Sequence, residues 1–530
     1  MTTQTVAASQ IPDRFNAVLP ALTVALVLLA SLLNFLNYND YPLLRPEVWI
    51  VAGLLLLVAA LSGIAYGAAS GVPRILLDIL VAYLALDLNF DGIGVPIAAV
   101  TAAVLLNRRL VPALAIVFSV VLLTELIIPN FGGDKVRAAH ILVPAAVDSD
   151  APALLHLIPD EHIGIEGLPR TMPEAEGVRE RLKAFYAENG FRLFGAAYSE
   201  YLHTVNAIPH ILNFGTEQAW TPQHKDGMAI GKNAYFDRLR ALGYEIKVHQ
   251  NDFVDYCANG PVRSCVVSAA AHLGLVAEST LSTGDKAKVI LCGFSWLADL
   301  ARVALHLYDT TALRLGAYGL DLPIVDFESK RWPSSINALA AMDTLIADLG
   351  AARPGEAYFA YVLLPHYPYA TRGDCSLKRQ SEWLAQASVG VSLKKRQRAY
   401  FDQLDCVITR LGDVVDAIAA SPAGENSIIL VHGDHGSRIT NVDPTAEHLG
   451  DFAESDLLSG YSTLFAIRAP GIAPGYGSAR LPVASLLAAL ADSGFNAIPA
   501  GGQDGASTVV LEDQAWRPAR RHPLPATWGR

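Results

Sequence analysis

The chain has 530 residues, of which 52% are hydrophobic and only 17% are charged, so it is more apolar than an ordinary soluble protein. Its formal net charge of -11 argues against nucleic-acid binding, which needs a basic surface. The apolar excess is concentrated in the first quarter of the chain. This distribution predicts a membrane anchor followed by a more polar domain.

The first 130 residues contain five apolar runs that are nearly free of charge: residues 17–37, 48–69, 75–88, 95–106 and 110–129. The first, second and last have the length of about 20 residues that spans a bilayer as a helix. We interpret all five as transmembrane helices. The alternative is four spans plus one re-entrant or interfacial segment, because the third and fourth runs are short.

Basic residues favour the cytoplasmic side of a membrane, and five spans place Arg14, Arg74 and Arg109 there together. The chain from about Phe131 onward then emerges on the extracytoplasmic side. The first run is too long for a cleavable signal peptide, so we expect the protein to stay anchored. The sequence therefore predicts a multi-pass protein of a bacterial-type inner membrane with a periplasmic domain.

Four parts are expected along the chain. Residues 1–130 form the anchor, residues 131–150 a linker rich in small side chains, and residues 151–500 the extracytoplasmic domain. Residues 501–530 are rich in Gly, Pro and Arg, which predicts a peripheral tail with little core of its own.

Four of the five cysteines fall into two pairs. Cys257 and Cys265 flank a short turn, and Cys375 and Cys406 stand on either side of a helical stretch. No CxxC motif occurs, which argues against a thiolate zinc site. In an oxidising compartment we expect disulfides between Cys257 and Cys265 and between Cys375 and Cys406. The alternative is buried free thiols.

Strand-like and helix-like segments alternate after residue 150. Buried strands are predicted at residues 153–159, 245–250, 358–364, 427–432 and 462–468, and helices at residues 173–188, 235–242, 335–349, 394–420 and 482–492. This order predicts an α/β domain with a central, mostly parallel sheet flanked by helices. Active residues are then expected beyond the carboxyl ends of the strands.

Residues 427–438, SIILVHGDHGSR, form an apolar run that ends in His432, Asp434 and His435, separated by glycines. A buried strand that opens into a glycine-rich loop brings a carboxylate and an imidazole to one point with little steric obstruction. These groups bind divalent metals. The plainer interpretation is a polar exit from the strand.

Three further segments carry polar residues with a chemical use. Asp160 and Glu161 follow the first strand, and a turn acid is the alternative there. Thr204 precedes a helical stretch, where the helix dipole would act on its hydroxyl, although a simple N-capping threonine is the alternative. His366 lies between two prolines, and an ordinary loop histidine is the alternative.

These four segments, in this order, resemble the alkaline phosphatase and sulfatase superfamily. The resemblance is strongest to its membrane-anchored branch of phosphoethanolamine transferases and lipoteichoic acid synthase-like enzymes, and it extends over roughly residues 154–490. It implies an alkaline phosphatase-like fold and a metal site made of Asp160, Thr204, Asp434 and His435. It also implies that His366 lies in the substrate pocket, and that a later histidine, here His448, joins it.

Two points qualify the resemblance. Sulfatases that use formylglycine carry a CxPxR or SxPxR signature, which this sequence lacks, so phosphoryl chemistry with a threonine nucleophile is expected instead of sulfate-ester hydrolysis. Glu161 stands beside Asp160, and either carboxylate could bind the metal, although the register of the strand favours Asp160.

The predicted ligands are two carboxylates, one imidazole and one hydroxyl, which suit tetrahedral zinc, with manganese or magnesium as alternatives and one or two ions in the site. A metal would lower the pKa of the Thr204 hydroxyl, while His366 or His432 would stabilise the transition state and His366 would protonate the leaving alkoxide.

Three functions are consistent with these residues. The first is transfer of a phospho-alcohol head group from a membrane phospholipid to an envelope glycan or lipid, because an anchor holds the site near lipid donors. The second is a phosphodiesterase, phosphatase or other sulfatase-like ester hydrolase with water as acceptor. The third is an inactive sensor or scaffold. Residues 288–308 are apolar with scattered charges and are predicted to form either an interfacial or a core helix.

Overall fold

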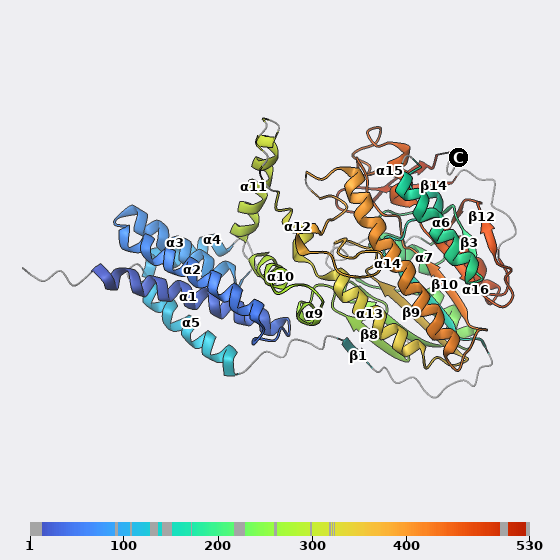
Figure 1. The fold of residues 1–530 in the computed structure, drawn as a ribbon, viewed down its shortest axis with the longest axis horizontal. Coiled ribbons are helices and arrows are strands. Elements are labelled where there is room, and N and C mark those ends of the chain that lie inside the picture. The colour runs from blue at the N-terminus through green and yellow to red at the C-terminus, as the bar shows by residue number, and fades with distance from the viewer. Residues whose placement is uncertain are drawn as a thin grey trace, which may run out of the picture. The chain divides into compact units, whose positions relative to one another are not determined.

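The computed structural model describes residues 13–90, 94–106, 109–127, 136–139, 151–170, 172–216, 228–258, 262–296, 299–316, 318, 320, 322, 324–388, 390–498 and 507–525 (Figure 1). The chain divides into two compact units. The first comprises Met1–Asp134 and Leu273–Phe327, and the second comprises Lys135–His272 and Glu328–Arg530. The first unit thus includes residues 273–327, which we expected to belong to one continuous domain of residues 151–500.

Helices occupy all five apolar runs of the first unit: α1 Asp13–Tyr38, α2 Pro46–Ala68, α3 Val72–Asp87, α4 Gly94–Leu106 and α5 Leu110–Ile127. In the described part of the chain, three are long and apolar enough to cross a membrane, namely α1 over Ala17–Tyr38, α2 and α5. Helices α3 and α4 have 16 and 13 residues, which is short of the length of about 20 residues needed for a full span. The length criterion therefore supports three of the five predicted spans.

Three more helices belong to the first unit: α9 Gly274–Glu278, α10 Thr283–Trp296 and α11 Asp299–Gly316. The single helix predicted at residues 288–308 is thus two helices. Helix α11 exposes Val303 and Leu307, each by more than half of its surface. Large exposed apolar side chains favour an interfacial helix over a core helix.

The second unit is built on a central sheet. Its described strands are β1 Val136–Ala139, β2 Leu154–Pro159, β3 Arg192–Phe194, β6 Glu245–Asn251, β8 Ser264–Ser268, β9 Glu356–Val362, β10 Ile428–His432, β11 Phe465–Arg468 and β12 Gly475–Gly477. Their order is β1-β8-β6-β9-β2-β10-β11-β3-β12. The five strands from β8 to β10 are mutually parallel, whereas β1, β11 and β3 form antiparallel pairs. The predicted α/β fold class is confirmed.

Alternate residues of the strands enter two cores on opposite faces of the sheet. Leu154, Ile158 and Phe359 pack on one face, and Leu155, Leu157 and Tyr358 on the other. The first face is covered by α7 Thr204–Leu212, α8 Ala234–Ala241 and α16 Val483–Asp492, and the second by α6 Pro173–Glu188, α13 Ser334–Leu349 and α14 Leu393–Ala420. Burial on both faces explains why these strands have continuous apolar sequences.

All five predicted strands and all five predicted helices of this domain are present, with ends shifted by a few residues. The elements that the sequence did not predict are short, and they include β4 Ala197–Tyr198, β5 Met228–Ala229, β7 Val254–Asp255, β13 Leu481–Pro482, α12 Phe327–Arg331 and α15 Glu454–Tyr461. Both predicted disulfides, Cys257–Cys265 and Cys375–Cys406, are present. Most of the predicted linker at residues 131–150 lies outside the described residues, and its residues 136–139 form β1.

The predicted C-terminal tail contains regular structure at residues 507–525. They form an antiparallel hairpin of β14 Thr508–Glu512 and β15 Pro518–Pro523. Val509 and Leu511 are fully buried and pack with Leu202 and Tyr461. The sequence TVVLE has the β-branched, apolar composition of a strand, and this signal is stronger than the Gly, Pro and Arg content of the flanking residues.

Candidate active site

Three neighbouring parallel strands deliver the predicted site residues to one edge of the sheet. Strand β2 lies between β9 and β10, and both pairings are parallel. Asp160 follows β2 directly, Asp434 and His435 follow β10, and His366 lies in the loop after β9. Parallel strands end on the same side of a sheet, so residues far apart in the sequence come together there.

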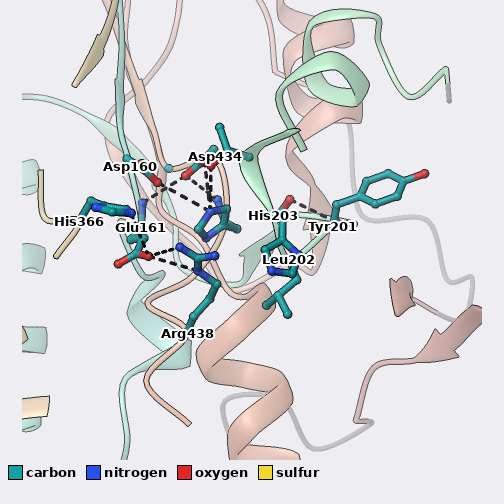
Figure 2. A network of polar contacts seen from close by, with 12 residues as sticks. Asp160, Glu161, Tyr201, Leu202, His203, His366, Asp434 and Arg438 are labelled. Atoms are coloured by element: carbon teal, nitrogen blue, oxygen red, sulfur yellow. Dashed lines mark hydrogen bonds and ion pairs between the residues drawn. The ribbon is translucent and has the colours of Figure 1, made fainter. Parts of the chain in front are cut away.

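Asp160, Asp434 and His435 form a buried cluster in which one ligand atom from each residue lies within 4.8 Å of the others. The Nε2 atom of His435 is 3.3 Å from Oδ2 of Asp434 and 3.7 Å from Oδ1 of Asp160. Figure 2 shows Asp160 and Asp434 close together. The arrangement brings together the side chains that the sequence predicted as metal ligands.

Thr204 adds a hydroxyl group to this cluster. Its hydroxyl donates a 2.8 Å hydrogen bond to Oδ2 of Asp434 and lies 3.3 Å from Nε2 of His435. The hydroxyl of Tyr361 lies 3.5 Å from it. Thr204 is the first residue of α7, whereas the N-cap is His203, whose side chain makes no capping bond. The N-capping alternative for Thr204 is therefore wrong.

The protonation of this cluster fits a divalent cation. Nδ1 of His435 lies 2.9 Å from the carbonyl oxygen of Gly436, which can only accept, so Nδ1 carries the proton and Nε2 presents its lone pair. Burial, together with the charges of Asp434 and Glu161, raises the pKa of Asp160 well above its usual value. Burial also opposes ionisation of Asp434, but His435 and the hydrogen bonds from Thr204 and Glu161 outweigh it and lower the pKa of Asp434. A divalent cation would relieve the repulsion between the two carboxylates.

Glu161 has a different partner from Asp160. Its carboxylate forms an ion pair with Arg438, and Nε2 of His366 lies 3.8 Å from its Oε1 (Figure 2). Its backbone is left-handed, with a φ of 64°, and its N–H donates to Oδ1 of Asp434 at 3.1 Å. Asp160 therefore stands in the cluster, while Glu161 orients Asp434 and holds Arg438 in place.

His366 borders this arrangement. Its Nδ1 lies 2.7 Å from the carbonyl oxygen of Tyr367, so Nδ1 is protonated and Nε2 is not when the ring is neutral. Burial lowers the pKa of His366, despite the opposing effect of Glu161. The ring is therefore neutral near pH 7, with Nε2 as a proton acceptor.

Two other predicted residues lie elsewhere. His432 points into the core, where its Nε2 is 2.7 Å from Nε2 of His156 and its Nδ1 is 2.8 Å from the carbonyl oxygen of Gly433. Burial lowers the pKa of His432 to about 4, so it supplies no positive charge to a transition state. His448 contacts Thr445 and the carbonyl oxygen of Asp443 in its own loop. The structure contradicts the predicted role of His432, whereas the place of His448 beside His366 stays a prediction.

The glycines around Asp434 and His435 allow close backbone contacts. A Cβ atom at Gly433 would lie 2.4 Å from Oγ1 of Thr463, and one at Gly436 would lie 2.2 Å from the carbonyl oxygen of Ser459. Real Cβ atoms do not approach so closely, so only glycine fits at these positions.

Three residues of the site were not predicted from the sequence. Arg438 stands in the predicted loop, two residues after Gly436, and its position was an available signal. Tyr361 lies within an apolar strand and Glu512 lies in the supposed tail, so neither carried a signal. Glu512 is fully buried and accepts hydrogen bonds from the residues that surround Thr204.

No family model and no curated protein matches the chain. Among solved structures it is similar to the C-terminal periplasmic domain of EcEptC from Escherichia coli in complex with Zn, with 11% identity, a TM-score of 0.39, and coverage of 73% of this chain and 99% of that one. It is also similar to a phosphonate monoester hydrolase of Agrobacterium radiobacter, with 14% identity, a TM-score of 0.39 and coverage of 69% and 81%.

A third similar structure is BT1596, a 2-O GAG sulfatase, with 12% identity, a TM-score of 0.38 and coverage of 68% of this chain and 78% of that one. All three similarities are distant, so the chemistry of the site rests on the side chains of this chain. In its motifs around Asp160, Thr204 and Asp434, this chain resembles proteins of the alkaline phosphatase and sulfatase superfamily.

Proposed function

We propose that this protein is a membrane-anchored, metal-dependent phosphotransferase. Thr204 would take a phospho-alcohol head group from a membrane phospholipid and pass it to a hydroxyl of an envelope glycan or lipid. The observation that carries this proposal is the position of the Thr204 hydroxyl, which lies within hydrogen-bonding distance of Asp434 and His435 in a buried cluster that also holds Asp160.

Asp160, Asp434, His435 and Thr204 would hold the metal, and zinc suits this set of oxygen and nitrogen donors. Oδ1 of Asp160 is buried and accepts no hydrogen bond, so its lone pairs are available to a cation. When bound, a divalent cation would lower the pKa of the Thr204 hydroxyl and offset negative charge on the transferred phosphoryl group.

In the first half-reaction, Oγ1 of Thr204 attacks phosphorus, and the bond from phosphorus to the lipid alkoxide breaks. Asp434 accepts the hydroxyl proton, because its Oδ2 is 2.8 Å from Oγ1 and its low pKa keeps it ionised. The departing alkoxide gains one proton, so this half-reaction releases none. Its product is a phosphodiester of Thr204 and the free lipid alcohol.

In the second half-reaction, an acceptor hydroxyl attacks the same phosphorus, the bond from phosphorus to Oγ1 of Thr204 breaks, and Oγ1 regains one proton, so this half-reaction also releases none. Neutral His366 presents an unprotonated Nε2, which suits it to accept the proton of the incoming hydroxyl. This assignment differs from the predicted role of His366 as the acid for the leaving alkoxide. Arg438, held beside the cluster by Glu161, would add positive charge near the equatorial oxygens of the phosphoryl group.

The three long apolar helices support a lipid donor, since an anchored site meets phospholipids at high local concentration. We also propose that the anchor crosses the membrane several times, that the second unit lies in the periplasm and that the acceptor is part of the cell envelope.

The test uses the full-length protein in detergent with a phospholipid that is isotopically labelled in its head group. We expect labelled head group on an added envelope glycan or lipid acceptor, and loss of this transfer after chelation of the metal. Release of labelled phospho-alcohol alone, even with acceptor in excess, would make the protein a hydrolase. Absence of both products from zinc-loaded protein would contradict the proposal.

A further inference from the structure

The C-terminal hairpin places a buried carboxylate against the start of α7. Glu512 has no exposed surface, and its Oε2 accepts hydrogen bonds from the backbone N–H of Leu202 at 2.8 Å and of His203 at 3.1 Å. Nδ1 of His203 lies 3.0 Å from the same oxygen, and the side-chain amide of Asn206 donates to Oε1. Both oxygens are thus used by groups close to Thr204.

Burial of a carboxylate is costly unless hydrogen bonds replace its lost hydration. Here two backbone donors, one imidazole and one amide do so, and the positive end of the α7 dipole adds a favourable field. The pairing of β14 with β15 is irregular between Leu511 and Glu512, and such irregularities change the direction of a side chain. The hairpin therefore presents this carboxylate to one specific segment.

Trp516 adds a second contact between the hairpin and the residues around Thr204. The ring of Trp516 stacks on the ring of His203, with centroids 4.9 Å apart and an angle of 21° between their planes. The carbonyl oxygen of Trp516 accepts a 2.7 Å hydrogen bond from the amide of Asn206. The hairpin thus holds residues on both sides of Thr204.

We propose that Glu512 is a positioning residue for the nucleophile, an inference that rests on the proposed function. Leu202 and His203 immediately precede Thr204, and Asn206 lies two residues after it. By fixing this backbone, Glu512 directs Oγ1 of Thr204 toward Asp434 and His435. Among the described contacts, Glu512 touches none of Asp160, Asp434 and His435.

The test compares Glu512→Gln with Asp513→Asn, which makes the same acid-to-amide change at the next residue. Asp513 accepts hydrogen bonds from Ala515 and Arg517 within the hairpin, and none of its hydrogen bonds among the described residues reaches α7. For Glu512→Gln we expect kcat to fall about tenfold or more with an unchanged KM, because small displacements of a reacting group are costly. Asp513→Asn should keep the parental kcat.

Hydrogen exchange of residues 199–206 provides a readout that needs no turnover. We expect exchange in this segment to rise about tenfold in Glu512→Gln and to stay parental in Asp513→Asn. Parental exchange and parental kcat in folded Glu512→Gln would overturn the proposal. A parent protein that turns over no phospholipid would contradict the proposed reaction alone, since the exchange result would still test whether Glu512 fixes the segment.

A second variant covers the case in which Glu512→Gln fails to fold. Asn206→Ala removes one donor to Glu512 and leaves both backbone donors in place. It should show the same two effects, with a smaller size. If Asn206→Ala left both exchange and kcat at parental values, the proposal would be refuted.

Discussion

The Thr204 hydroxyl donates a 2.8 Å hydrogen bond to Oδ2 of Asp434, although the two residues are 230 positions apart in the sequence. The other oxygen of Asp434 is occupied by backbone donors, since Oδ1 accepts the N–H groups of Glu161 at 3.1 Å and of His435 at 2.9 Å. The backbone therefore fixes this carboxylate so that Oδ2 faces the nucleophile.

Loss of a proposed metal ligand should remove the metal but not the fold. We expect Asp434→Ala and His435→Ala each to abolish turnover and to lose most of the bound zinc, because each removes a metal ligand. The fold should survive, because the sheet packing does not depend on these side chains. Elemental analysis and circular dichroism measure the two quantities. His448→Ala is the matched control, since that ring lies outside the cluster, and it should keep its zinc. Parental zinc content in Asp434→Ala would rule out this ligand assignment.

Asp160 and Glu161 should respond in opposite ways to amide substitution. Asp160→Asn should lose zinc with little loss of stability, because the ionised form of this carboxylate is disfavoured by burial and by Asp434. Glu161→Gln should keep zinc but lower the free energy of unfolding by about 3 kcal/mol, because it leaves Arg438 without its partner. Urea unfolding measures the stability of each variant, and elemental analysis measures its zinc content. The reverse pattern would mean that Glu161 is the ligand.

Gly436→Ala should damage the site through the backbone. Its new Cβ would lie 2.2 Å from the carbonyl oxygen of Ser459, so the loop that holds Asp434 and His435 must move. We expect weaker zinc binding in competition with a chelator, and a lower melting temperature. Gly231→Ala is the control, because nothing lies within 4 Å of its Cβ position. Equal zinc affinity in the two variants would show that the close contact is not required.

Stability of the metal-free protein should fall with acidification below pH 6.5. Burial lowers the pKa of His432 from 6.5 to about 4 and lowers that of His156 well below 6.5. Between pH 6.5 and pH 4 the unfolded chain therefore binds more protons than the folded chain. The contribution of the two histidines to the free energy of unfolding is thus fully present above pH 6.5 and is lost as the pH falls toward 4. His432 alone would contribute a loss of about 3 kcal/mol. Urea unfolding as a function of pH measures the slope, which the double variant His156→Leu, His432→Leu should reduce. An unchanged slope would show that the pair does not titrate this way.

Much of the second unit was predictable, because its main elements carry their own signals. Strands buried on both faces are continuous apolar runs, as in β2 and β10, and their parallel order places Asp160 and Asp434 at one edge of the sheet. The glycines beside Asp434 predicted a loop with little steric obstruction, and the structure adds that Gly433 and Gly436 have close contacts there.

Other features depend on long-range packing, which a pattern does not contain. His432 looked equivalent to His435, yet strand alternation turns it into the core against His156. Glu161 looked equivalent to Asp160, yet its left-handed backbone directs it to Arg438. The role of Glu512 arises only when the C-terminal hairpin packs on α7. The number of spans depends on helix length, and α3 and α4 end before the length that a full span needs.

The most direct test of the central claim is peptide mass mapping of the zinc-loaded protein after exposure to the labelled phospholipid without an acceptor. We predict a labelled phosphodiester on Thr204 that disappears when acceptor is added. Thr204→Ala should carry no label while it keeps its fold and most of its zinc, and Thr204→Ser should be labelled more slowly. Label on another residue, or near-parental turnover by Thr204→Ala in a preparation free of related enzymes, would contradict the mechanism.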